Sequence, residues 1–191
     1  MSGRLQTWPS GDATLATAPA PWGAGDNHRV WRLGSDIDTD LLAPGHAMKH
    51  GIETIAQHCL EALRPEFAEA ARAGDVIVAG PNFGIGSSRE QAVAVLVQLG
   101  LAAVIAPSFG GLYFRNAFNL GLLLLTCPRA EEVAEGDRIQ LRAGSDGVFS
   151  VVTDSGGTLP CEVVPSFLMD MVRAGGLLNQ LRRRAGKEHL R

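Results

Sequence analysis

The sequence reads DVIVAGPNFGIGSSREQAVAVLVQLG from Asp75 to Gly100, and this segment is the most informative about the fold class. It begins with β-branched residues typical of a buried strand, predicted at residues 75–80. It continues through a glycine-rich turn at residues 81–87 and ends in a helix predicted from about Ser88 to Leu99. A strand that leads through a short turn into a helix is typical of the first half of a β-α-β unit.

The alternation of strand and helix continues on both sides of this segment. Toward the C-terminus we predict a strand at 103–106, a helix at about 109–119 and a strand at 122–126. Toward the N-terminus we predict a strand at 30–33, and a helix at 52–63 in which apolar residues recur every three or four positions. This order predicts an α/β fold, a mixed and mostly parallel sheet flanked by helices.

Beyond Pro128 the pattern changes to short strands separated by Gly, Asp and Ser. We expect small antiparallel strands at 138–141, 148–152 and 159–163, a helix after Pro165 and a last amphipathic helix from Leu177. Residues 1–27 are rich in Pro, Gly and small side chains and have no periodicity, so they predict a flexible extension. The remaining residues 28–191 are expected to form one domain.

The composition excludes several classes of protein. Of 191 residues, 46% are hydrophobic and 19% charged, and the net charge is −3, which predicts a globular protein without affinity for nucleic acid. No apolar run is long enough to span a membrane, and no signal peptide is recognisable. The three cysteines are odd in number and too widely spaced for a disulfide framework or a zinc site, so no metal ligand is expected. Unpaired cysteines indicate a reducing compartment, and the cytoplasm is therefore the expected location.

The glycine turn carries the candidate chemistry. Gly84 and Gly86 permit positive φ and close approach, and backbone N–H groups at a helix start favour an anion. Ser87 and Ser88 either bind a carboxylate or simply cap the helix, and spacing alone does not distinguish these uses. Arg89 offers two parallel hydrogen bonds to a second carboxylate. The turn lacks the patterns of a phosphate loop, a dinucleotide-binding loop and a nucleophile elbow.

Several segments together resemble one known family. Residues 82–92, NFGIGSSREQA, are similar to the signature of the aconitase swivel domain and of the separate small subunits of isopropylmalate isomerase and homoaconitase. The acidic segment 36–40, the segments 65–67 and 74–80, and residues 108–122 resemble further parts of the family in the family's order. The resemblance covers roughly residues 28–180 and implies the swivelling β/β/α fold.

The resemblance also implies a reaction and a partner. In this family the small subunit closes over a large subunit that holds a 4Fe-4S cluster, and the complex dehydrates and rehydrates a hydroxy acid, with iron as Lewis acid and a serine alkoxide as base. By position, Ser87 would be the base, and Gly86, Ser88, Arg89 and Asp40 would bind a di- or tricarboxylate. The positions that would read the variable part of the substrate are His46, Lys49 and His50.

The sequence departs from the family pattern at three places, which bear on the substrate. Position 85 is Ile where many relatives carry a small or polar residue or Cys, and position 91 is Gln where His is frequent. Residues 43–50, APGHAMKH, do not match the loop associated with isopropylmalate enzymes. The expected reaction is the conversion of 2- to 3-isopropylmalate in leucine biosynthesis, with homoaconitate, citramalate or another hydroxy acid as alternatives. An alternative of another class is a non-catalytic module in which the turn binds a carboxylate or phosphate.

Overall fold

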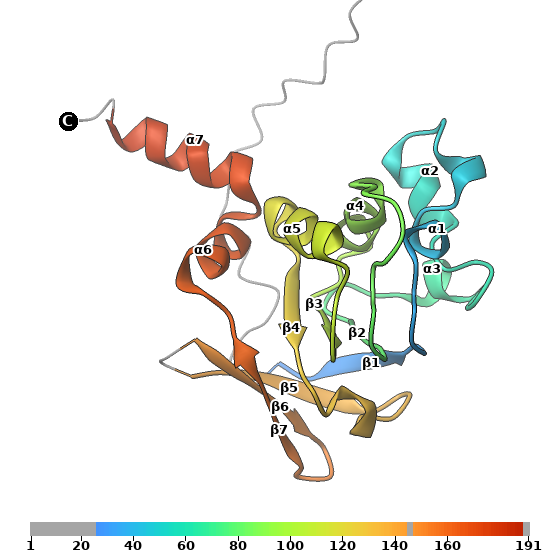
Figure 1. Cartoon of the computed structure of the whole chain (residues 1–191), viewed down its shortest axis with the longest axis vertical. Coiled ribbons are helices and arrows are strands. Elements are labelled where there is room, and N and C mark those ends of the chain that lie inside the picture. Colours follow the sequence, from blue (N-terminus) through green and yellow to red (C-terminus); the bar gives the residue numbers. More distant parts are fainter. Residues whose placement is uncertain (1–25, 145–146, 189–191) are drawn as a thin grey trace, which may run out of the picture.

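The computed structural model describes residues 26–144 and 147–188. Its centre is a seven-stranded sheet in the order β4-β3-β2-β1-β5-β6-β7. Figure 1 shows most helices gathered on one side of the molecule and the strands that follow residue 137 at the other. Most of the predicted flexible extension, residues 1–25, lies outside the described residues.

The first four strands form the parallel half of the sheet. They are β1 (His28–Arg32), β2 (Val76–Val78), β3 (Ala103–Ala106) and β4 (Leu123–Thr126). Val76 pairs with Val30 on one side and with Ala103 on the other. Every residue of β2 and β3 is buried, because both faces of a parallel sheet are covered by the connections between its strands.

The last three strands form the antiparallel half. β5 (Arg138–Ala143) pairs with β1, and β6 (Val148–Thr153) and β7 (Thr158–Val163) follow in hairpin order. Buried residues alternate with more exposed ones along β5 and β7, as expected where one face is in contact with water. The predicted α/β class and the antiparallel strands near the C-terminus are therefore confirmed.

Four longer helices accompany the sheet. They are α4 (Gln91–Gln98), α5 (Gly111–Leu120), α6 (Ser166–Ala174) and α7 (Leu177–Glu188). Figure 1 shows α4 and α5 beside the upper ends of the parallel strands, and α7 extending from α6 at the edge of the molecule. Within the described residues, no helix combines the length and the apolar character that a membrane span requires.

The predicted helix at 52–63 is wrong in its length, since α2 (Ile52–Gln57) ends at Gln57. Leu60 is fully buried with φ at 60°, which a right-handed helix does not allow, and its N–H donates to the Leu41 carbonyl at 2.8 Å. The turns after α2 thus continue the buried apolar face that the periodicity detected. The elements that the sequence did not predict are short: α1 (Thr39–Leu42), η1 (Gly45–Ala47), α3 (Phe67–Ala70) and η2 (Ala130–Glu132).

Candidate active site

Three segments that are distant in sequence meet at the carboxyl end of β2. The N–H of Gly84 donates to the Ile37 carbonyl at 2.7 Å, and the N–H of Thr39 donates to the Ile85 carbonyl at 2.9 Å. Phe83 pairs with Phe109 from the segment that leads into α5. Ligands of open α/β sheets commonly bind at the carboxyl ends of the parallel strands, so these contacts place the glycine turn where a site is expected.

Both glycines of the turn are required by its conformation. Gly84 has φ of +76°, and a Cβ at this position would lie 2.1 Å from Cγ of Tyr113. Gly86 has φ of +100°, and its Cβ would lie 3.1 Å from Oγ1 of Thr39. The turn therefore packs against α5 on one side and against α1 on the other, and no other residue type fits without moving these neighbours.

Tyr113 itself is not a catalytic candidate. Its side chain is buried against Gly84, and its hydroxyl has no hydrogen-bond partner among the described residues. Burial raises the pKa of Tyr113 well above its usual value, so the phenol stays protonated and cannot act as the base.

Ser87 and Ser88 are exposed on the turn rather than used as helix caps. Helix α4 begins at Gln91 with Glu90 as its N-cap residue, so the predicted start at Ser88 is wrong by about one turn. Oγ of Ser87 lies 3.3 Å from Oγ1 of Thr39, and the Ser88 carbonyl accepts a hydrogen bond from Nδ2 of Asn116 at 3.3 Å. Both hydroxyls are therefore left available for a ligand.

The turn also presents unused backbone donors. The N–H groups of Gly86, Ser87 and Ser88 have no hydrogen-bond acceptor anywhere in residues 26–144 and 147–188. Three successive N–H groups of this kind, close to the start of α4, form a site for the negative charge of a carboxylate.

Arg89 is held in place by the segment around α1. Its Nη1 contacts Oδ1 of Asp40 and donates to the Ala43 carbonyl at 3.0 Å. Among the described residues Arg89 bonds through Nη1 alone, which leaves Nε and Nη2 for a ligand. The carboxylate of Asp38 is used as a helix cap, because its Oδ1 accepts from the N–H groups of Asp40 and Leu41 at the start of α1.

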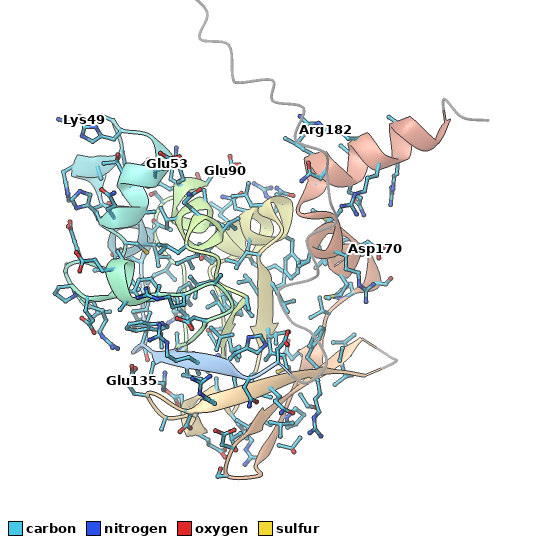
Figure 2. The ribbon with its side chains drawn as sticks, turned by 180° about the vertical axis from the view of Figure 1, so that it is seen from behind. Lys49, Glu53, Glu90, Glu135, Asp170 and Arg182 are labelled. Atoms are coloured by element: carbon cyan, nitrogen blue, oxygen red, sulfur yellow. The ribbon has the colours of Figure 1, made fainter. Side chains whose placement is uncertain are left out.

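The other predicted site residues are less closely associated with the turn. His46, Lys49 and His50 are exposed, and none of them contacts Ser87, Ser88 or Arg89 among the described residues. Figure 2 shows Lys49 at the same rim of the molecule as Glu53 of α2 and Glu90 at the start of α4. The segment that contains them begins directly after Ala43, whose carbonyl binds Arg89.

Two further residues contact the turn. Thr39 is almost fully buried, and its hydroxyl lies against that of Ser87. Asn116 of α5 donates to the Ser88 carbonyl. Neither contact has a sequence signal, because each joins residues about 30 to 50 positions apart.

The cysteines of this chain do not fit an iron–sulfur cluster, whose ligands are thiolates that converge on one site. The three cysteines of the sequence are all buried free thiols. Sγ of Cys127, directly after β4, donates to the Pro160 carbonyl of β7 at 3.8 Å, and burial raises the pKa of Cys59 far above its usual value. Cys59 is therefore a protonated core side chain rather than a ligand.

The fold and the site define a class of protein. Residues 48–130 match the family model of the aconitase C-terminal domain, and this range includes α2, the glycine turn and α5. This match agrees with the resemblance of the sequence to the aconitase swivel domain.

Comparison with individual proteins narrows the class. The chain is 39% identical over 161 residues to a 3-isopropylmalate dehydratase small subunit from Heliobacterium modesticaldum, covering 83% of this chain and 96% of that one. It is 42% identical over 159 residues to 3-isopropylmalate dehydratase small subunit 1 from Methanopyrus kandleri, covering 81% and 91%. The crystal structure of a 3-isopropylmalate dehydratase from Methanocaldococcus jannaschii superimposes with a TM-score of 0.79 at 34% identity, covering 85% and 96%. The chain belongs to the family of 3-isopropylmalate dehydratase small subunits.

Proposed function

We propose that this chain is the small subunit of a two-subunit hydro-lyase that converts 2-isopropylmalate to 3-isopropylmalate in the cytoplasm. The observation that carries the proposal is the exposed turn after β2, which presents Ser87, Ser88 and Arg89 together at the carboxyl end of that strand. The relatives named above support the substrate, since each is a 3-isopropylmalate dehydratase. The three free thiols support a reducing compartment.

The proposed roles follow from the contacts of the turn. The free N–H groups of Gly86, Ser87 and Ser88 and the Ser88 hydroxyl bind one substrate carboxylate, and the free edge of the Arg89 guanidinium binds the other. Asp40 is a positioning residue, because its carboxylate holds Arg89 and would itself repel a carboxylate substrate. This role replaces the direct substrate contact expected for Asp40 from the sequence.

Ser87 is the proposed base that removes the proton α to a carboxylate. A serine hydroxyl is far too weak a base at its ordinary pKa, so the anion needs stabilising neighbours. The hydroxyl of Thr39, 3.3 Å away, can donate to it, and the free N–H groups of the turn belong to the same three residues, Gly86, Ser87 and Ser88. The 4Fe-4S cluster of the proposal belongs to the large subunit and would supply Lewis acidity, because this chain lacks a fitting set of ligands.

The decisive experiment is Ser87→Ala in the complex reconstituted with the large subunit. We expect turnover to fall by about 10²–10⁴-fold, because a positioned general base contributes that much, with little change in the dissociation constant of 2-isopropylmalate. Ser155→Ala is the matched control, since Ser155 lies in the exposed turn between β6 and β7 and should behave as wild type.

Two other results would point elsewhere. Weaker substrate binding with only a modest loss of rate would favour the non-catalytic anion-binding module. Full activity on homoaconitate or citramalate, with none on 2-isopropylmalate, would keep the reaction class and replace the substrate.

A further inference from the structure

Outside the glycine turn, two imidazoles and a carboxylate converge between η1 and the end of α2. Nε2 of His46 lies 3.2 Å from Oε1 of Glu61, and Nδ1 of His58 lies 2.6 Å from Oε2 of the same carboxylate. The two rings meet edge to face with their centroids 5.1 Å apart. One nitrogen from each ring and one oxygen of Glu61 all lie within 4.8 Å of one another.

We propose that His46, His58 and Glu61 form a binding site for a divalent transition-metal ion, with Zn²⁺ as the best match. Two histidines and a glutamate are a donor set that Zn²⁺ uses in proteins, in tetrahedral geometry with water as the fourth ligand. Ligand bonds of about 2.0–2.2 Å place neighbouring donor atoms roughly 3.4 Å apart, so the donors must approach by at most about 1.4 Å.

The three side chains are free to make this adjustment. The His46 side chain is 61% exposed, and those of His58 and Glu61 are 37% exposed, so solvent and ions reach them and rotation of the side chains is sufficient. His58 is the C-cap residue of α2 and Glu61 lies three positions later in the turns that follow, so two ligands come from one short segment, while His46 approaches from η1.

Charge and proton balance are consistent with a divalent cation. Without the ion, the ring nitrogen that faces Glu61 carries a proton and donates it to the carboxylate. When the ion binds, this nitrogen must lose its proton. If the ring is neutral, the proton is transferred to the other ring nitrogen, and if the ring is an imidazolium, the proton is released to solvent. Two neutral imidazoles and one carboxylate then provide a single negative charge against the charge of Zn²⁺.

The site joins η1 to the turns that follow α2. His46 belongs to the segment that starts after Ala43, the residue whose carbonyl binds Arg89. A bound ion would fix this segment to the end of α2 and so limit the movement of the exposed residues Lys49 and His50 (Figure 2). The proposal is independent of the proposed reaction, because it concerns the isolated chain.

The test is titration of the untagged full chain, stripped of metal, with Zn²⁺ in competition with a chromophoric chelator. We expect one ion per chain. Loss of a ligand in His46→Asn, His58→Asn or Glu61→Gln should weaken binding by at least about 100-fold, since even the loss of an outer partner of a ligand costs about 10–100-fold. His50→Asn makes the same change on the same segment and should keep the affinity of the wild type.

Two spectroscopic measurements on the wild-type chain make the result independent of how the variants fold. Titration with Co²⁺ should give visible bands of tetrahedral coordination without the near-ultraviolet bands of thiolate ligands. Zn²⁺ should shift the imidazole resonances of His46 and His58 and leave those of His28 and His50 in place. No stoichiometric binding, thiolate bands, or unchanged affinity in the ligand variants would each overturn the proposal.

Discussion

Gly84 illustrates how much of the site depends on one residue without a side chain. Its positive φ and the contact with the ring of Tyr113 both exclude a Cβ. Because Tyr113 is buried on α5 and its ring packs edge to face against Phe83, the ring cannot move away. The position of the whole turn therefore depends on this residue.

Gly84→Ala should lower the free energy of unfolding by about 3 kcal/mol or more, from overpacking and from positive φ. Gly111→Ala is the control, because Gly111 begins α5 with open space around its Cα and should be neutral or stabilised by up to about 1 kcal/mol. Urea unfolding measures both. Equal stabilities for the two variants would contradict the tight packing of the turn.

Arg89 should not tolerate lysine. Lysine keeps the charge but loses the planar guanidinium, whose Nη1 binds Asp40 and the Ala43 carbonyl and whose free edge is the proposed site for a substrate carboxylate. We expect kcat/KM of the reconstituted complex to fall by about 10–100-fold, the equivalent of one charged hydrogen bond. Arg173→Lys, at an exposed pair with Asp170, should have no effect.

At the scale of secondary-structure elements, Asp75 joins the first two parallel strands. The residue precedes β2, and its Oδ2 accepts from Nε of Arg29 at 3.1 Å and from Nε1 of Trp31 at 2.9 Å, both on β1. A further hydrogen bond comes from the N–H of Arg72 at 2.9 Å. Burial favours the neutral carboxyl, but the hydrogen bonds from Arg29 and Trp31 outweigh it and hold the pKa of Asp75 below its usual value.

Asp75→Asn should therefore destabilise the protein by about 2 kcal/mol near neutral pH. A depressed pKa stabilises the folded state above the unfolded pKa of about 4, and this stabilisation is lost as the pH falls through the folded pKa. The difference between wild type and variant should be constant above about pH 5 and shrink below about pH 4. Asp170→Asn, at an exposed pair, should change stability by less than about 0.5 kcal/mol at any pH.

The element boundaries show where local sequence information is insufficient. β3 and the hairpin strands agree closely with the prediction, because their burial pattern is repeated along each strand. α2 and α4 are shorter than predicted, since Leu60 and the turn before Gln91 adopt conformations set by contacts with other segments. α1 was missed because it is a single turn that depends on the cap at Asp38.

At the scale of the whole molecule, the proposed active site is incomplete. Ser87 and Ser88 are exposed, and a serine anion in contact with bulk water would be protonated at once. A second protein surface must cover the turn and exclude water, which is the role that the proposal gives to the large subunit. The cysteines of this chain, all of them buried, leave the cluster to the same partner.

The isolated chain should consequently show no turnover of 2-isopropylmalate, and activity should appear only when the large subunit is added. Absorbance of the unsaturated acid intermediate measures this, and the large subunit alone is the control. Turnover by this chain by itself would contradict the division of the site between two subunits.

The succession of strands and helices along the chain, the glycine turn and the candidates Ser87, Ser88 and Arg89 within it follow from the sequence, because they depend on local patterns and short-range spacing. The sequence does not contain the contacts of Thr39 with Ser87, of Asp40 with Arg89, or of His46 with Glu61. These contacts join segments that only the folded sheet and the turns after α2 bring together. Their geometry depends on packing across the whole domain, and no local pattern in the amino-acid sequence indicates that packing.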